Sequence, residues 1–475
     1  MSALEPVIGL EIHVQLKTRT KMFCGCELSF GEPPNTRTCP VCLGLPGSLP
    51  VANARAIHFA LMIGLALGSK IAPRSIFHRK NYFYPDLPKG YQISQYDEPI
   101  CRGGELAGVR MHRVHLEEDA AKLIHVGESG RIHGSERSVV DFNRGGTPLV
   151  EIVTEPELDS PEHAREWLTL LRATLRSLGV SDVNMEEGSL RVDANVSLRP
   201  AGTTELGTKT ELKNMNSFRF IERGIAAEIE RQHGIIESGG RIAQETLHFD
   251  PSSGHITSLR SKEEAQDYRY FPEPDLIPIA TTEAMRAAAE AEIGELPLDR
   301  AQRLEADLGL GADSARNLAF RPELGDYFEQ VVALVGADHA PQVANWMTQL
   351  VARIGDEDPA ASNVTPQALA ELVKLVAARA VSGAAAREVL DVLVAAGGEP
   401  GAIIAARGLG SLSSDDDDLA GIVAKAIASD PSAAERVKTG NEKAIGALVG
   451  AVMRETRGRA DGAAVTALIR EQLGL

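Results

Sequence analysis

The chain has 475 residues, and its 49 basic and 66 acidic side chains give a formal net charge of −17. At about 150 residues per domain, this length predicts three domains. Its 43% of hydrophobic and 24% of charged residues are ordinary for globular proteins and exclude collagen-like, wholly disordered and disulfide-dense chains. Because nucleic-acid binders neutralise phosphates with Lys and Arg, so acidic a chain can contact RNA only over a limited surface.

The first residues carry no targeting signal. No apolar run approaches the roughly 20 residues that a membrane span needs. Residues 1–6 have neither the basic nor the apolar region of a secretory signal, and a strand-like run begins at Val7. We therefore expect a cytoplasmic protein with no membrane partner.

Residues 1–292 are predicted to form one α+β domain. Short alternating apolar segments separated by Gly, Pro and Asn are typical of strands and loops in a mainly antiparallel sheet. One helix is predicted between Ser160, its N-cap, and Gly179. A second is predicted over residues 217–233, with Gly234 ending it.

The remainder is predicted to be all helix. It is rich in Ala, Leu, Val and Glu, with helix starts such as Thr365-Pro366 and almost no strand pattern. Glycine-rich and aspartate-rich segments near residue 405 indicate a further boundary. We expect a helical domain at 293–405 and a helical tail domain at 406–475.

Several predicted strands carry polar side chains on one face. In residues 7–16 the period of two places Glu11, His13 and Gln15 opposite an apolar face. The same alternation exposes Glu151 and Glu155, Asp193, Asn195 and Ser197, and Glu211, and the run Glu117-Glu118-Asp119 follows His115.

Two interpretations of these faces remain open. An antiparallel sheet usually leaves one face in solvent, and such a face alternates in the same way. These faces, however, are rich in carboxylates and imidazole, which are ligands for hard cations. If the strands share one sheet, its polar face is suited to Mg²⁺ and, through Mg²⁺, to nucleotide phosphates.

Known phosphate-binding and nucleophile motifs do not fit the chain. Residues 202–210 nearly match a P-loop, but an extra threonine separates the second glycine from the lysine, and a strand-like pattern follows. There is no Gly-x-Ser-x-Gly elbow around a nucleophilic serine. The chain is therefore not expected to hydrolyse an amide itself.

Residues 77–92 combine five aromatic with four basic side chains, counting His78, and are broken by Pro and Gly. Such a segment can stack on bases and bind phosphates. An ordinary surface loop held by its own tyrosines is the alternative.

Four of the five cysteines lie close together as Cys24-x-Cys26 and Cys39-x-x-Cys42. Two close thiolate pairs are typical of a tetrahedral structural Zn²⁺ site. Four independent buried thiols are the alternative. Cys101 stands alone and is predicted to be a small buried hydrophobic residue.

Long strings of the sequence resemble the B subunits of the bacterial aspartyl/glutamyl-tRNA amidotransferases. These strings are residues 7–16, 39–47, 79–92, 141–149 and 267–276, with 440–450 near the end of the chain. The match runs from end to end and is weakest over about 281–410.

The resemblance implies a heterotrimer. An amidase-type A subunit would release ammonia from glutamine, and a small C subunit would brace the pair. The B subunit would use ATP and Mg²⁺ to activate the side-chain carboxylate of misacylated Glu-tRNA(Gln), Asp-tRNA(Asn) or both, which ammonia then converts to the amide. The implied fold is an α/β cradle followed by helical domains that contact tRNA.

The resemblance also implies roles for single residues. Glu11 and His13 match the family's Glu-x-His metal motif, and the four cysteines match a zinc knot that only some members keep. Glu118 and Glu151 are further candidates for the metal site, and Glu117, Asp193 and Glu211 are secondary candidates for the metal and nucleotide site. Arg79 and Lys80 are the candidates for balancing phosphate charge.

The predicted tail has a local excess of positive charge. Residues 436–470 hold seven basic and three acidic side chains. Those expected to bind tRNA include Arg436, Lys438, Lys443, Arg454, Arg457 and Arg459. A solvated helix face is the alternative, and a non-catalytic tRNA-binding scaffold is the alternative to the whole functional interpretation.

Overall fold

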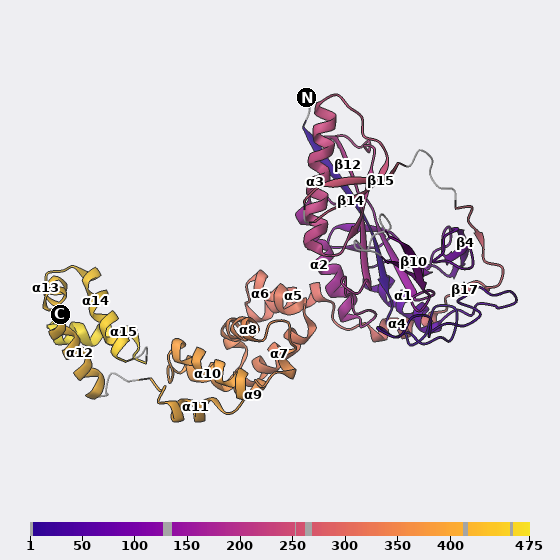
Figure 1. Cartoon of the computed structure of the whole chain (residues 1–475). Helices are drawn as coiled ribbons and strands as arrows, with labels where there is room; N and C mark the ends of the chain where they lie inside the picture. Colours follow the sequence, from indigo (N-terminus) through magenta and orange to yellow (C-terminus); the bar gives the residue numbers. More distant parts are fainter. Residues whose placement is uncertain (1–2, 127–134, 252, 262–267, 412–416, 457–458) are drawn as a thin grey trace. The chain divides into compact units, whose positions relative to one another are not determined.

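The computed structural model describes residues 3–126, 135–251, 253–261, 268–411, 417–456 and 459–475. The chain divides into two compact units, residues 1–296 and 297–475. The first is an α+β unit and the second is all helical (Figure 1). The predicted fold class is therefore confirmed.

A ten-stranded sheet forms the body of the first unit. Its strands follow the order β15-β14-β13-β12-β1-β11-β8-β6-β2, and β7 pairs with β8. Only β13 and β14 are parallel among the described pairs. The strands are β1 (Leu4–Gln15), β2 (Lys70–Ile71), β6 (Cys101–Arg102), β7 (Glu105–Leu106), β8 (Val109–Glu118), β11 (Pro148–Thr154), β12 (Leu190–Pro200), β13 (Thr210–Met215), β14 (Glu245–Phe249) and β15 (Ile256–Ser261).

β1 lies at the centre of this sheet and shows the predicted alternation. Its side chains Leu10, Ile12 and Val14 are buried in the apolar core, while Glu11 and His13 lie half-buried on the other face. Burial of these apolar side chains fixes the register, because a slip of one residue would exchange the two faces.

Helices α2 (Pro161–Ser177) and α3 (Phe218–Glu237) pack against each other, and α3 packs on β12 and β13. α2 begins after Ser160, its predicted N-cap, and α3 begins one residue after its predicted start, with Ser217 as its N-cap. The predicted end of α3 at Gly234 is wrong. The helix continues to Glu237 and ends before Gly239, whose φ is 80°, because glycine inside a helix costs only about 1 kcal/mol.

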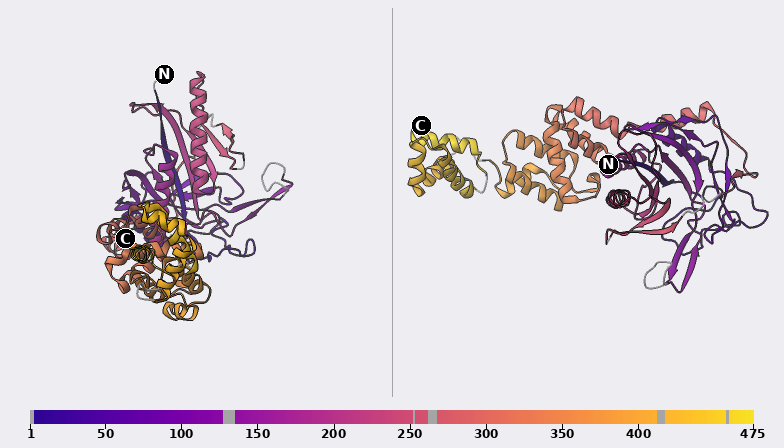
Figure 2. Two further views of the ribbon diagram at one scale, coloured as in Figure 1. Left: turned by 90° about the vertical axis from the view of Figure 1, so that its left-hand side faces the viewer. Right: turned by 90° about the horizontal axis from the view of Figure 1, so that it is seen from above.

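Short elements surround the large sheet, and the pair β9–β10 extends away from it (Figure 2). Helix α1 packs on β2, β6 and β8, and α4 packs on α1. These elements are α1 (Ala54–Ala66), β3 (Arg74–Ser75), β4 (His78–Asn81), β5 (Tyr91–Ser94), β9 (Lys122–Val126), β10 (Arg137–Asp141), β16 (Phe271–Pro272), β17 (Ile279–Ala280) and α4 (Glu283–Glu292). Strands β16, β4 and β5 form a three-stranded sheet, and β17 pairs with β3.

The second unit contains two separate apolar clusters, one running from Ala301 to Leu393 and one from Leu419 to Ile469. Thr365 caps a helix as predicted. The predicted boundary at 405 falls inside α11, and residues 412–416 lie outside the described residues. The helices are α5 (Pro297–Leu308), α6 (Ala312–Ala319), α7 (Pro322–Val335), α8 (Ala340–Ile354), α9 (Pro366–Ala377), α10 (Gly383–Ala396), α11 (Pro400–Arg407), α12 (Asp417–Ser429), α13 (Pro431–Lys438), α14 (Ile445–Glu455) and α15 (Gly462–Leu473), with short 3-10 turns η1 (Ala337–His339), η2 (Pro359–Ala361) and η3 (Glu442–Ala444).

Over the described residues, no single helix has both the length and the apolar character to cross a membrane. The bent pair α10 and α11 has these properties only when the two helices are joined, and they meet at 115°.

Candidate functional site

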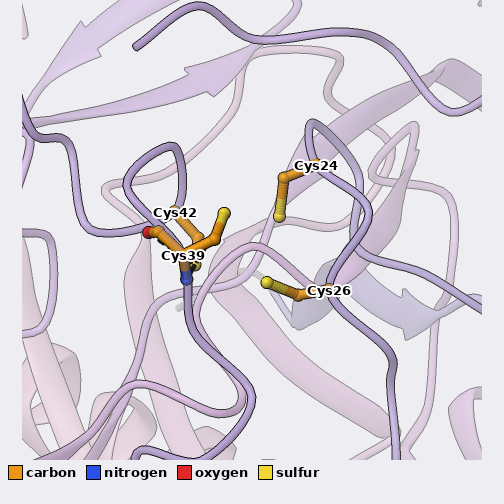
Figure 3. A group of neighbouring side chains, drawn as sticks. All are labelled: Cys24, Cys26, Cys39 and Cys42. Atoms are coloured by element: carbon orange, nitrogen blue, oxygen red, sulfur yellow. Dashed lines mark hydrogen bonds between the residues drawn. The ribbon is translucent and has the colours of Figure 1, made fainter.

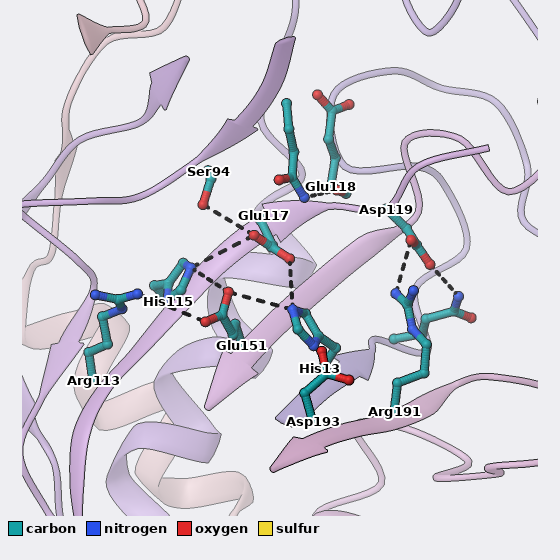
Figure 4. A network of polar contacts seen from close by, with 12 residues as sticks. His13, Ser94, Arg113, His115, Glu117, Glu118, Asp119, Glu151, Arg191 and Asp193 are labelled. Carbon is teal, nitrogen blue, oxygen red and sulfur yellow. Dashed lines mark hydrogen bonds and ion pairs between the residues drawn. The ribbon is translucent and has the colours of Figure 1, made fainter. Parts of the chain in front are cut away.

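His13, Glu117 and Glu151 form a compact group on the polar face of the sheet, which we call the His–Glu group (Figure 4). They come from the adjacent strands β1, β8 and β11. His13 is directly opposite Glu151, and Glu151 is directly opposite His115. Opposite residues of an antiparallel pair share one face, so the strand register itself brings these side chains together.

The ligand atoms of the His–Glu group lie within 4.8 Å of one another. His13 Nε2 is 3.6 Å from Glu117 Oε1 and 3.6 Å from Glu151 Oε2. Both carboxylates are buried. Two carboxylates and an imidazole at this spacing fit a divalent cation, and the carboxylates favour a hard one such as Mg²⁺.

Neighbouring polar groups hold these carboxylates in place. His115 Nε2 lies 3.3 Å from Glu151 Oε2 and 3.8 Å from Glu117 Oε2. Ser94 donates a hydrogen bond to the latter oxygen at 3.2 Å. Each buried carboxylate therefore has compensating partners, as a buried charge requires.

The charges in this group shift one another. Burial lowers the pKa of His13, but the hydrogen bond to Glu151 and the charges of Glu151 and Glu117 outweigh it and raise that pKa to about 9. Burial raises the pKa of Glu151, but the charges and hydrogen bonds of His115 and His13 hold it well below its ordinary value. The protein thus keeps these carboxylates ionised inside a buried site.

A cavity of about 730 Å³ opens beside the His–Glu group. His13 and Glu117 line it. Its basic side chains are Lys80, Arg191 and Lys213. A volume of this size is ordinary for the binding site of a small ligand or nucleotide.

The two predicted phosphate partners lie apart. Lys80 lines the cavity, and the carboxylates Glu117 and Glu151 raise its pKa against the effect of burial. Arg79 is the adjacent residue of β4 and therefore points to the other side. Its guanidinium is paired with Glu273 at 2.6 Å and with Asp275 at 3.1 Å, so its charge is already balanced.

The structure does not bring Glu118 to the His–Glu group. Glu118 pairs with Lys89 and accepts the N–H of Ile93 at 3.0 Å. Figure 4 shows Glu117 directed toward His13 and Glu118 directed away. Successive residues of a strand point to opposite faces, and Glu117 is the one that shares a face with His115.

The other predicted acidic residues lie along the same polar face. Asp193 lines the cavity, and Lys213 Nζ lies 2.7 Å from it and 2.9 Å from Glu211. Glu11 accepts a hydrogen bond from Asn195 at 3.0 Å and is not among the residues that line the cavity. Paired acidic and basic side chains therefore continue along this face of the sheet beyond the His–Glu group.

The four predicted cysteines converge, although they come from two separate loops (Figure 3). Their sulfurs lie within 4.8 Å of one another. In a tetrahedral site with zinc–sulfur bonds of about 2.3 Å, sulfurs stand about 3.8 Å apart. A hydrogen bond from Cys24 lowers the pKa of Cys42, which favours a thiolate. The donor set and its spacing fit Zn²⁺.

The aromatic segment at 77–92 forms β4, β5 and the connection between them. Tyr82 lines the cavity, together with Tyr268 from a distant part of the chain, and Lys80 Nζ lies 4.9 Å from the Tyr268 ring. Phe83 is 85% exposed. Part of this segment therefore borders the cavity and part faces solvent.

The predicted tRNA-binding residues lie in the second unit. Arg436, Lys438, Lys443 and Arg454 are exposed, and Arg459 is half-buried. Arg457 lies outside the described residues.

Three residues near the site are not among the main candidates that the sequence indicates. Glu117 is only a secondary candidate beside Glu118, although its parity with His115 on the strand indicates the polar face. His115 itself, buried beside both carboxylates, is not among the predicted site residues. Arg191 has no motif, and only the register that places it opposite His13 identifies it.

Comparisons with known proteins show which family the chain belongs to. The model described as "GatB/GatE catalytic domain" matches residues 6–287, and the one described as "GatB domain" matches residues 326–473. The B subunit of the aspartyl/glutamyl-tRNA(Asn/Gln) amidotransferase from Anaeromyxobacter sp. (strain K) is 48% identical over 100% of this chain and 99% of its own. The corresponding B subunit from Thermobifida fusca is 50% identical over 99% of this chain and 94% of its own. The chain belongs to the family of aspartyl/glutamyl-tRNA(Asn/Gln) amidotransferase B subunits.

Proposed function

We propose that the first unit activates the side-chain carboxylate of glutamate or aspartate esterified to tRNA, using ATP and Mg²⁺. A carboxylate oxygen attacks the γ-phosphorus and ADP leaves. Ammonia then attacks the activated carbonyl, and phosphate leaves as the amide forms. The products are Gln-tRNA(Gln), Asn-tRNA(Asn) or both.

The observation that carries this proposal is the meeting of the His–Glu group with Lys80 in one cavity. Transfer of a phosphoryl group to a carboxylate brings two anions together, and enzymes solve this by positioning and by opposite charge. His13, Glu117 and Glu151 would hold Mg²⁺, which neutralises phosphate charge when bound. Lys80 adds a positive charge at the cavity wall.

The source of ammonia lies in a partner. No nucleophile motif of the amidase type occurs in this chain, so we propose that an amidase A subunit supplies ammonia from glutamine and that a small C subunit completes the heterotrimer. We further propose that the exposed basic residues of the second unit contact tRNA, and that the complex acts in the cytoplasm.

The cysteine cluster supports a structural role for Zn²⁺. Four sulfur donors leave no open position for substrate or water, as in structural zinc sites. Metal analysis of protein purified without chelator is expected to find one zinc per chain. Protein that is folded and free of zinc would contradict this part of the proposal.

The test of the main proposal is His13→Ala in the reconstituted heterotrimer, with His163→Ala as its control. His163 lies on α2 and pairs only with Asp159 among the described residues. Loss of a metal ligand should lower tRNA-dependent ATP cleavage and amide formation more than about 100-fold, since even outer-shell changes cost about 10- to 100-fold. Glutamine hydrolysis by the partner should largely persist.

Two outcomes would contradict the proposal. Full amide formation by the His13→Ala complex would show that the His–Glu group takes no part in the reaction. A wild-type complex that binds misacylated tRNA without any tRNA-dependent ATP cleavage would favour the scaffold alternative. Assays with each misacylated tRNA in turn would decide which amino acid is the substrate.

A further inference from the structure

Arg191 stands directly opposite His13 across the β1–β12 pair. Directly opposite side chains of an antiparallel pair start about 5 Å apart on the same face. Both residues line the same cavity, and Figure 4 shows the Arg191 side chain running alongside His13. Arg191 is therefore placed at the His–Glu group by the backbone of the sheet.

A buried carboxylate fixes the direction of this arginine. Arg191 Nη2 lies 2.9 Å from Asp119 Oδ1, and Asp119 is only 3% exposed. Gln15 donates a hydrogen bond of 2.8 Å to the other oxygen of Asp119, and Arg144 Nε lies 3.7 Å from that same oxygen. Arg144 is itself anchored on the carbonyl oxygens of residues 120 and 121.

The guanidinium of Arg191 keeps hydrogen-bonding capacity in reserve. Its Nε is buried and has no hydrogen-bond partner among the described residues. A guanidinium carries five N–H donors in a planar fork that matches phosphate and carboxylate oxygens. Asp119 also lies between Arg144 and Arg191. These two arginines and one carboxylate together retain a net positive charge.

The other cations near the cavity are less suited to this task. Arg79 spends Nε and Nη2 on Glu273 and Asp275. Lys213 lies between two carboxylates. Lys80 is an ammonium on a flexible stem and cannot make the forked contact of an arginine.

We propose that Arg191, positioned by Asp119 and Gln15, binds an oxyanion of the substrate opposite the His–Glu group. This inference rests on the proposed function, in which two such oxyanions meet in the cavity: the transferred phosphoryl group and the side-chain carboxylate. Both groups present at least two oxygens at the spacing to which the paired N–H groups of a guanidinium can donate. Asp119 and Gln15 are positioning residues, because they act through Arg191.

The experiment measures tRNA-dependent ATP cleavage by heterotrimers carrying Arg191→Met, Arg191→Lys and Arg191→Ala. Loss of a preorganised charge at the reacting group should lower kcat about 100-fold or more in Arg191→Met. Arg191→Lys should retain about tenfold more activity than Arg191→Met, because it keeps the charge. Added ethylguanidinium should restore part of the activity of Arg191→Ala.

Two further variants test the positioning of Arg191 and provide a control on the same strand. Asp119→Asn should lower kcat about tenfold, because the fork loses its charged partner. Arg199→Met should stay within about twofold of wild type. Arg199 lies on the same strand and pairs with Glu5 at 2.6 Å, away from the cavity.

The Michaelis constants separate the two oxyanions. A raised KM for ATP in Arg191→Lys assigns the contact to the phosphoryl group, and a raised KM for misacylated tRNA assigns it to the carboxylate. The proposal is overturned if Arg191→Met stays within about threefold of wild type. It is also overturned if lysine and ethylguanidinium restore nothing and activity falls only in proportion to folded complex, measured by thermal unfolding and by partner glutamine hydrolysis.

The proposed function is tested independently in the same series. Activity that survives in His13→Ala contradicts the proposed function whatever Arg191→Met shows. Activity lost in His13→Ala and kept in Arg191→Met contradicts this inference alone.

Discussion

The two candidate metal sites of the first unit are built in opposite ways. The His–Glu group stands on three paired strands, and each charged side chain already faces an opposite charge. The cysteine cluster stands on two loops, and its thiols have mainly one another and adjacent backbone as partners. Strand register can therefore hold the first site without a cation, whereas the second depends on one.

The largest expected effect is on the cysteine cluster. Cys39→Ser combined with Cys42→Ser should abolish zinc binding and lower the free energy of unfolding of the first unit by about 4 kcal/mol, at free zinc about 1,000 times its Kd for wild type. Zinc content and denaturant unfolding measure this. Cys101→Ala, buried outside the cluster, should keep its zinc. A double variant that retains one zinc per chain would show that Cys39 and Cys42 are not needed to bind it.

Glu118 belongs to neither site, which gives the second prediction. Glu118→Gln leaves the ammonium of Lys89, whose side chain is only 10% exposed, without its partner, so the free energy of unfolding should fall by about 3 kcal/mol. Glu118→Gln with Lys89→Met should recover part of that loss, as a double-mutant cycle by denaturant unfolding would show. A loss of Mg²⁺ affinity comparable with that of a Glu151 variant would instead place Glu118 among the ligands.

The third prediction separates activity from stability at the His–Glu group. Glu151→Gln should lower tRNA-dependent amide formation more than about 100-fold, equivalent to about 2.7 kcal/mol of activation free energy. The strand pairing should survive, and the thermal midpoint should shift by only a few degrees. Glu155→Gln is the control, since Glu155 pairs with His112 at an exposed position. A collapse of the fold in Glu151→Gln would show that register alone does not hold this site.

The weakest effect is expected in the second unit, where Arg436 and Lys438 are exposed on the surface. Arg436→Gln with Lys438→Gln should weaken tRNA binding about tenfold near 0.1 M salt and reduce the salt dependence of binding. Lys425→Gln is the control, because Lys425 is already paired with Glu455 at 2.7 Å. Equal salt slopes in the wild type and the double variant would leave these two residues outside the contact.

Local rules predicted the parts of the fold that depend on neighbours in sequence. Ser160 and Thr365 cap helices as predicted, because a hydroxyl satisfies free N–H groups where a helix begins. The alternation of β1 also appears as predicted. The predicted end of α3 was wrong because glycine inside a helix costs only about 1 kcal/mol, and the helix continues past Gly234 to Glu237.

Contacts between distant residues could not be predicted in the same way. Glu117 and Glu118 are neighbours on β8, and strand parity, which the sequence contains, places Glu117 and not Glu118 on the face of His115. Arg79 resembled a free cation because its partner, Glu273, follows it by nearly two hundred positions. Which strands become neighbours decides such pairings, and no periodicity within one strand contains that information.

β1 lies at the centre of the sheet, but both of its partner strands are synthesised much later than β1 itself. Its partners β11 and β12 end only at Thr154 and Pro200. At usual translation rates the ribosome needs on the order of ten seconds or more to pass from β1 to the end of these partners. During that time the nascent segment presents an apolar stripe with no strand to pair with. β1 can therefore join the sheet only after β11 and β12 have left the ribosome. Chaperones that shield nascent chains are expected to meet this segment first.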